Sequence, residues 1–153
     1  VMSSREQLRR WSQTTWPTDT FTLAENLKDL EGHEQEHHEQ VAFTFTVLNP
    51  AGTRCLGCVY ITPLGEYAEE LCADTTYAAR VGFWVRTSEL ANSLDEHLLS
   101  TLRNWFAAEW PFELITFITS QQNTQQMTLC TEAGLKQQLA FEFKAGRPCW
   151  LYG

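Results

Sequence analysis

The sequence lacks any apolar run that approaches the ~20 residues of a membrane-spanning helix. Positive charge is also scarce, because 11 Lys and Arg stand against 19 Asp and Glu, which gives a formal net charge of −8 at pH 7. Such a surface repels phosphate backbones and anionic lipid, so neither nucleic acid nor a membrane is an expected partner, whereas a cationic amine is attracted. The polar, charged start of the chain, residues 1–10, does not have the pattern of a signal peptide.

The number of cysteines is odd. There are five of them, scattered along the chain, so we expect reduced thiols in a cytoplasmic protein rather than a secreted disulfide framework. No internal repeat or low-complexity tract divides the sequence. Its 153 residues, 43% of them hydrophobic, are enough for a sizeable core, and we expect a single domain over 1–153.

The first third of the chain has the pattern of helices. Residues 4–11 carry apolar side chains at helical spacing. Thr22 and Glu25 have the spacing of a capping box, which predicts the start of a second helix with three leucines on one face. Gly32 fits the end of that helix, and the charged segment 31–40 is predicted to be a solvated turn or a frayed end.

The period then changes to that of strands. Alternation over 43–48 and again over 55–62, around turn-forming residues at 49–52, predicts a β-hairpin. The short apolar run 81–85 is typical of a strand that is covered on both faces.

The clearest helix lies in the second half of the chain, where one apolar stripe runs over 94–106 behind a Ser93–Glu96 capping box. A strand over 114–119 and a short helix over 124–132 follow, and two last strands are predicted at 136–143 and 148–152. The strand–helix–strand unit in the middle implies a right-handed parallel crossover, while the hairpins imply antiparallel pairing. The sheet is therefore predicted to be mixed.

One local pattern is more specific than this order of elements. Asn123 follows a predicted strand, and Leu129, Gly134 and Leu135 stand at fixed spacings after it. The order of elements over 4–152, together with this spacing, resembles the GNAT family of N-acetyltransferases. The resemblance implies a mixed α/β sheet with parallel fourth and fifth strands flanked by helices. The first strand of that family is missing or truncated in this sequence.

The resemblance implies an activity. Members of the family transfer an acetyl group from acetyl-CoA to a primary amine by direct attack, so the expected substrate is a small-molecule or peptidyl amine. The 81–85 segment resembles the family's fourth strand, whose backbone pairs with the pantetheine arm of the cofactor. Phe83, Trp84 and Val85 are therefore expected cofactor contacts. Asn123 is a further expected contact, although an N-cap role with Gln126 explains it equally well.

The loop that binds the cofactor's pyrophosphate departs from the family pattern. In register, the resemblance places Asn92, Ser93, Leu94 and Asp95 in it, and no glycine is present. Glycines let a backbone approach phosphate closely, and free amides at a helix start bind it. Ser93 and Glu96 are expected to cap each other there, and Asp95 adds negative charge. The sequence therefore predicts weak binding of CoA.

The catalytic positions are changed as well. Cys130 aligns with the tyrosine that acts as an acid in the family; a thiol can protonate a leaving thiolate, and a buried small residue is the alternative interpretation. Arg80 stands where the family often has an acidic base. Glu66, Glu69 and Glu70 are candidate substitutes on a predicted acidic loop.

The altered loop and catalytic positions leave a second function open, that of a binding or regulatory domain without catalysis, including one half of a tandem acetyltransferase. The oligomeric state is also open, a homodimer included.

Two sequence motifs suggest metal sites. His33 and His37 lie in an H-E-x-x-H pattern, but the segment is wholly polar, so no zinc protease site is expected. Cys55 and Cys58 form a C-x-x-C on a predicted strand, where residues three apart point to opposite faces. We therefore expect no metal site.

Overall fold

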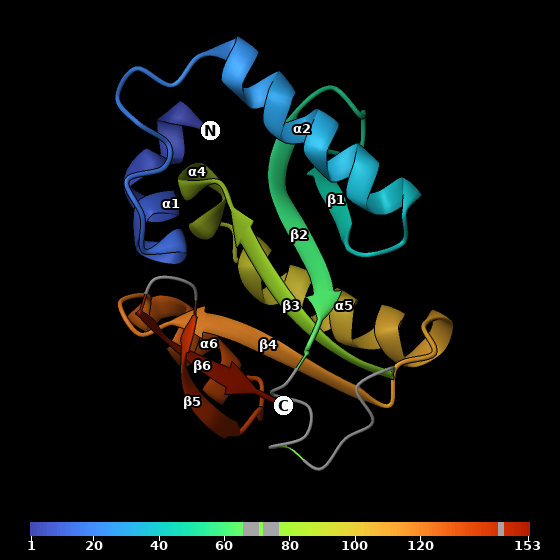
Figure 1. The fold of residues 1–153 in the computed structure, drawn as a ribbon. Coiled ribbons are helices and arrows are strands. Elements are labelled where there is room, and N and C mark those ends of the chain that lie inside the picture. Colours follow the sequence, from blue (N-terminus) through green and yellow to red (C-terminus); the bar gives the residue numbers. More distant parts are fainter. Residues whose placement is uncertain (66–70, 72–76, 144–145) are drawn as a thin grey trace.

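A six-stranded mixed sheet forms the centre of the fold. The computed structural model describes residues 1–65, 71, 77–143 and 146–153. In these residues the strand order is β1-β2-β3-β4-β6-β5 (Figure 1). β3 and β4 run parallel, and the other four neighbouring pairs are antiparallel, which confirms the predicted topology. The strands are β1 Phe43–Leu48, β2 Cys55–Pro63, β3 Ala78–Val85, β4 Leu114–Ser120, β5 Gln137–Phe143 and β6 Arg147–Tyr152.

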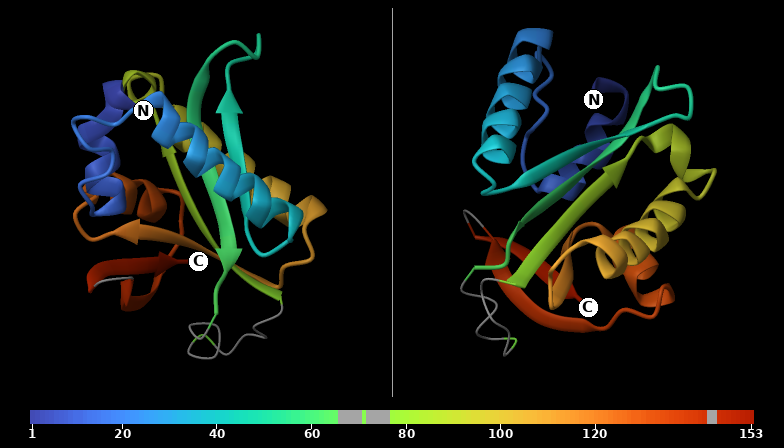
Figure 2. Two further views of the ribbon diagram at one scale, coloured as in Figure 1. Left: turned by 45° about the horizontal axis from the view of Figure 1, so that its top comes forward. Right: turned by 90° about the vertical axis from the view of Figure 1, so that its right-hand side faces the viewer.

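Helices cover both faces of this sheet. α1 and α2 lie on one side, and α5 and α6 lie on the other (Figure 2). α5 makes the crossover from β3 to β4. The helices are α1 Arg5–Ser12, α2 Leu23–His38, α4 Thr87–Leu90, α5 Leu94–Glu109 and α6 Thr124–Glu132, with a 3₁₀ turn at Met2–Ser4. α4 was not predicted from the sequence. Within the described ranges, no strand precedes α1, and no helix has the length and apolar character needed to cross a membrane.

The main core lies between the sheet and α5. The predicted apolar stripe of α5 faces it: Leu98, Leu99, Leu102 and Phe106 are buried. They pack with Val59, Ile61, Ala79, Val81, Phe83, Val85 and Phe117 from β2, β3 and β4. Because burying a large aliphatic or aromatic side chain contributes about 1.5–3 kcal/mol, this layer fixes the positions of β3 and β4.

The second helix is longer than the sequence predicted. α2 passes through Gly32 and ends at His38. Gly32 ends no helix because its φ is not positive, as a glycine C-cap requires. The predicted polar turn is helical because His33 packs on the ring of Tyr60 and His37 packs on aromatic rings of β1.

The leucines of α2 face solvent. Leu23, Leu27 and Leu30 are 75%, 52% and 47% exposed, and the helix has no buried residue. The start of the helix is held by the predicted capping box, in which Thr22 accepts from the Glu25 amide and Glu25 accepts from the Thr22 amide. α2 is thus fixed by its cap and by its histidine contacts rather than by its leucine stripe.

Candidate functional site

The two parallel strands separate halfway along their length. β3 and β4 pair from Ala78 and Leu114 up to Val81 and Phe117. Beyond this point β3 continues to Val85 against β2, and β4 continues to Ser120 against β6. Figure 1 shows the divergence of the two strands. A slot lies at this split, and its walls come from β3, α1, α4, α5 and α6.

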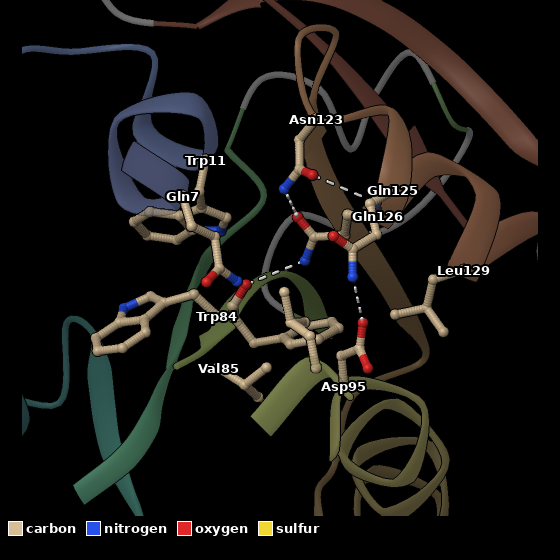
Figure 3. A pocket seen from close by; sticks show the side chains of 11 residues that line it. Gln7, Trp11, Trp84, Val85, Asp95, Asn123, Gln125, Gln126 and Leu129 are labelled. Atoms are coloured by element: carbon tan, nitrogen blue, oxygen red, sulfur yellow. Dashed lines mark hydrogen bonds between the residues drawn. The ribbon is translucent and has the colours of Figure 1, made fainter. Parts of the chain in front are cut away.

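Side chains fill this slot almost completely. It is lined by Gln7, Trp11, Phe83, Trp84, Val85, Leu90, Asp95, Asn123, Gln125, Gln126 and Leu129 (Figure 3). The remaining volume of about 20 Å³ has room for roughly one water molecule. The structure therefore brings together five of the expected cofactor contacts: Phe83, Trp84, Val85, Asp95 and Asn123.

Gln126 is the residue of the slot that sequence reasoning missed as a functional residue. Its Nε2 donates to the carbonyl oxygen of Phe83 at 3.0 Å, and its side chain is buried. Asn123 donates from Nδ2 to Oε1 of Gln126 at 3.1 Å. Its Oδ1 accepts from the backbone N–H of Gln126, which confirms the N-cap role of Asn123. The signal in the sequence was the glutamine three residues after Asn123, whose long side chain carries an amide.

The start of α5 differs from the prediction. The capping box is wrong, because Ser93 adopts a left-handed conformation with φ 52° and makes no side-chain bond to a helix amide. The turn that leads into α5 bonds the Ser93 amide to the carbonyl of Leu90, and the Ser93 hydroxyl donates to Glu96 Oε1 at 3.1 Å. Within the described part of the chain, the amides of Leu94, Asp95 and Glu96 have no acceptor. Free amides at a helix start favour an anion.

Negative charge beside this helix start opposes the binding of an anion. An open groove of about 300 Å³ runs between α5 and α6 beside the slot. Three carboxylates line it, those of Asp95, Glu96 and Glu132, and the described lining residues include no cation. Gln125 donates to Asp95 Oδ2 at 3.2 Å and so links the two helices. Asn92 is exposed in the preceding turn and is not part of this lining.

The nearest arginines are bound elsewhere. Arg86 donates to the carbonyl of Cys55 and to the Ser3 hydroxyl. Arg103 donates to the carbonyl of Ala133 at the far end of α6. Neither guanidinium lines the slot or the groove. These two arginines therefore do not supply the positive charge that would bind a pyrophosphate.

A second cavity lies on the α1 face of the sheet at the same split. It has a volume of about 210 Å³ and is lined by Trp11, Ser12, Tyr60, Thr62, Arg80, Gly82, Ile118, Ser120, Arg147 and Cys149. Trp11 lines both this cavity and the slot. Gly82 keeps the cavity open, because a Cβ there would lie 3.3 Å from Ile118 Cγ2 and 3.5 Å from Trp11.

Aromatic side chains form one wall of this cavity. The rings of Trp11 and Tyr60 lie 5.4 Å apart, and Trp84 donates from Nε1 to the Tyr60 hydroxyl at 3.2 Å. Burial raises the pKa of Tyr60 well above its ordinary value, so the phenol stays protonated. Arg80 donates to the Thr62 hydroxyl at 3.1 Å. The cavity therefore offers hydroxyl, aromatic and guanidinium groups to a ligand.

The candidate acid–base residues do not meet in the slot. Cys130 is fully buried in the core, and burial raises its pKa to about 12, which keeps the thiol neutral. It lines neither the slot nor the second cavity. Glu66, Glu69 and Glu70 lie outside the described residues.

The H-E-x-x-H motif lies on a helix, contrary to the expectation of a turn. His33 and His37 are four residues apart on α2, and His33 contacts the Glu36 carboxylate at 3.2 Å. No group of three or more His, Cys, Asp or Glu side chains suited to a metal occurs within the described residues. The absence of a metal site stays a prediction.

The C-x-x-C expectation was wrong in its geometry. The register of the β1–β2 pair shifts by one residue beside Leu56, since Val47 pairs with Gly57 and Leu48 pairs with Cys55. This bulge places the Cys55 and Cys58 side chains on the same face of the strand, and the Cys55 thiol donates to the Gly57 carbonyl oxygen at 3.6 Å. Burial, followed by the neighbouring Cys55, raises the pKa of Cys58 to about 12.

The comparisons with known proteins point to one fold. No protein-family model and no curated protein sequence matches the chain. Among solved structures, the ribosomal-protein-S5-alanine acetyltransferase of Vibrio fischeri is similar, with a TM-score of 0.70 and 15% identity over 99% of this chain and 81% of the other. RimJ of Mycobacterium smegmatis, solved with a CoA disulfide, has a TM-score of 0.74 and 14% identity over 99% of this chain and 71% of the other.

A third similar structure is RimL, a ribosomal L7/L12 alpha-N-protein acetyltransferase in complex with coenzyme A. It has a TM-score of 0.73 and 12% identity over 99% of this chain and 81% of the other. The chain therefore has the fold of the GNAT acetyltransferases.

Proposed function

We propose that the protein is an acyl-CoA-dependent N-acetyltransferase that acetylates a primary amine. The observation that carries this proposal is the split between β3 and β4, with a slot that runs through the split from α1 to α6 and a cavity beside it on the α1 face of the sheet. A reactant in the slot and another in the cavity can meet at the split, because Trp11 lines both. The similar structures were solved as acetyltransferases, two of them with CoA bound.

The slot side is assigned to the cofactor. The backbone of Phe83, Trp84 and Val85 forms the edge along which an amide arm can pair. Asn92, Ser93, Leu94 and Asp95 lie at the start of α5, where free amides favour pyrophosphate. Asn123 holds the start of α6 at the inner end of the slot. When bound, acetyl-CoA supplies an acetyl group activated as a thioester.

The cavity side is assigned to the amine. Its volume of about 210 Å³ suits a small molecule or the end of a peptide, and its aromatic wall can pack on an alkyl chain. In direct transfer the nitrogen of a neutral amine bonds to the acetyl carbon as the carbon–sulfur bond breaks, and the leaving thiolate gains a proton. Arg80 and Arg147 line the cavity and no described carboxylate does, so the amine must enter neutral and its proton passes to water. Cys130 stays the predicted acid from the resemblance, but burial raises its pKa to about 12, which makes its thiol a weaker proton donor than an ordinary thiol. The thiol must become accessible for this role, because it is fully buried.

The fit of acetyl-CoA to these residues is incomplete. The diverging strands and the open amides of α5 match the cofactor. However, Gln126 takes the Phe83 carbonyl and fills the slot, and three carboxylates line the outer groove. Weak binding in this conformation is therefore part of the proposal.

Titration of the protein with acetyl-CoA, followed by an assay of thiol release with a panel of amines, tests the function. We expect binding weaker than micromolar and turnover with at least one small or peptidyl amine. Binding without turnover over the whole panel contradicts the enzymatic proposal. The Gly82→Val variant should lower turnover, because its side chain would occupy the amine cavity against Ile118 and Trp11. Because Trp11 also lines the slot, the affinity for CoA is measured on the same variant to separate the two effects.

The second candidate is a GNAT-fold binding or regulatory domain without catalysis, which includes one half of a tandem acetyltransferase. The filled slot and the acidic groove favour it. The two candidates differ in one measurement, since an enzyme must bind acetyl-CoA and a degenerate domain need not.

A further inference from the structure

The side chain of Gln126 crosses the slot from α6 to β3 (Figure 3). Its Nε2 donates to the Phe83 carbonyl oxygen at 3.0 Å, and its Oε1 accepts from Asn123 Nδ2 at 3.1 Å. The side chain is 7% exposed. Both ends of the carboxamide are thus paired inside a slot that has room for about one water molecule.

The Phe83 carbonyl is the acceptor that an amide-bearing ligand needs. It lies beyond Val81, the last residue of β3 that pairs with β4, so β4 gives it no partner. A buried carbonyl needs a donor, and Gln126 supplies a carboxamide N–H. The pantetheine arm of CoA carries the same type of donor. Gln126 therefore takes both the hydrogen bond and the space that such an arm would use.

A second glutamine strengthens the closed arrangement. Gln125 donates to Asp95 Oδ2 at 3.2 Å and so joins α6 to α5. The next residue, Gln126, joins α6 to β3. In Figure 3 the Gln125 amide is directed to Asp95, whereas the Gln126 amide is directed to β3.

We propose that Gln126 is an internal substitute for the amide arm of an acyl-CoA and controls the affinity of the slot for it. This inference rests on the proposed function. The slot admits the arm when the Gln126 side chain turns away from Phe83, which breaks two buried hydrogen bonds. The open form is then a minor population, and the apparent affinity falls in proportion to that population. From the usual net strength of such bonds, the reduction is about ten-fold.

Binding of pantetheine and of CoA, measured by calorimetry, tests the proposal. Pantetheine is the sharper probe, because it has no phosphate and does not respond to the carboxylates of the groove. Gln126→Ala should bind both probes about ten-fold more tightly than the wild type. Gln126→Ser should show the same direction and serves as a second small variant if the alanine protein does not fold. Gln122→Ala, an exposed glutamine just before α6, is the matched control and should not change either affinity.

A further variant separates occupied space from the hydrogen bond. Gln126→Met removes the carboxamide but keeps a long side chain in the slot. It should bind pantetheine more tightly than the wild type, because no hydrogen bond has to break, but less tightly than Gln126→Ala, because a long side chain must still leave the slot. An equal gain in Gln126→Met and Gln126→Ala would overturn the argument that the side chain fills the binding space.

Failure of this inference is distinct from failure of the proposed function. If folded Gln126→Ala binds pantetheine no better than the wild type, the inference is wrong whatever the activity. If Gln126→Ala binds CoA more tightly but neither protein acetylates any amine, the inference holds and the enzymatic proposal fails.

Discussion

Removal of two carboxylates at the start of α5 should strengthen the binding of CoA. The change is Asp95→Asn with Glu96→Gln, which keeps the shape of both side chains. Both residues line the acidic groove, and no cation among its described lining residues balances them. The amides of the same helix turn have no acceptor within the described residues. The double variant thus leaves the favourable helix start in place and removes the opposing charge.

The size of this effect follows from Coulomb's law. Two unit charges ~4 Å apart interact by about 1 kcal/mol in bulk water and by more near a protein surface. Because the groove is open and salt screens it, the two carboxylates together should oppose a pyrophosphate by on the order of 1–2 kcal/mol. Their removal should tighten CoA binding by about ten-fold.

The double variant should cost little stability. Ser93 makes no hydrogen bond to a backbone amide of α5, so no cap is lost. Loss of acidic charge at the helix start costs about 0.3–1 kcal/mol. The melting temperature should therefore fall by no more than a few degrees.

Calorimetry with CoA at low salt and again at about 1 M salt measures the effect, since the Debye length falls to about 3 Å there. The gain should disappear at high salt. Asp29→Asn with Glu31→Gln, two exposed positions on α2, changes the net charge equally and should have a much smaller effect. Sub-micromolar binding by the wild type, or a gain that persists at high salt, would refute the reasoning.

Three further predictions concern side chains outside the groove. With iodoacetamide at about pH 8, mass spectrometry should find Cys55 alkylated well before Cys58 and Cys130. Cys55 is exposed, whereas burial raises the pKa of both other thiols to about 12. Equal rates of alkylation would contradict this prediction. Hydrogen bonds from Thr22 lower the pKa of Glu25, so their stabilisation is present at neutral pH and lost as pH falls through the folded-state value. Urea unfolding should therefore find Glu25→Ala less stable than the wild type at pH 7 and similar to it near pH 2. Cys130→Ala should lower the free energy of unfolding by about 1 kcal/mol, because it leaves a small void in the core. If the protein is active and the variant has unchanged kinetics, Cys130 has a packing role only.

The sequence predicted the elements whose determinants are local or strongly periodic. The β1–β2 hairpin is one: Asn49 accepts at Oδ1 from the amides of Thr53 and Arg54, at 2.9 and 2.8 Å, so the turn is built from its own residues. The long crossover helix is another, because its apolar stripe lies within one segment and a proline, Pro111, follows directly after the helix and its C-cap. The parallel pairing of β3 with β4 followed from the long helix that connects them.

Elements decided by tertiary contacts were predicted less well. The sequence around Gly32 gives a reason to stop α2, and the ring contacts of His33 and His37 that keep it helical come from strands further along the chain. Ser93 and Glu96 have capping spacing, yet the turn after α4 forces a left-handed Ser93 and prevents the cap. In each case the rule considers only neighbouring residues, and a contact with another part of the structure decided the outcome.

The slot shows the same limit at the level of function. Asn123 has a recognisable spacing, and the structure gives it the N-cap role that the sequence left open. Gln126 has an ordinary place in a short helix, and only the split between β3 and β4 turns its amide into a partner for Phe83. The resemblance to acetyltransferases is carried by the backbone, whereas side chains decide whether the cofactor can enter. A sheet that opens in this way must satisfy its exposed carbonyl with either a ligand or its own side chain. In this conformation it uses its own, so the affinity of the slot for a ligand depends on how easily Gln126 gives up that bond.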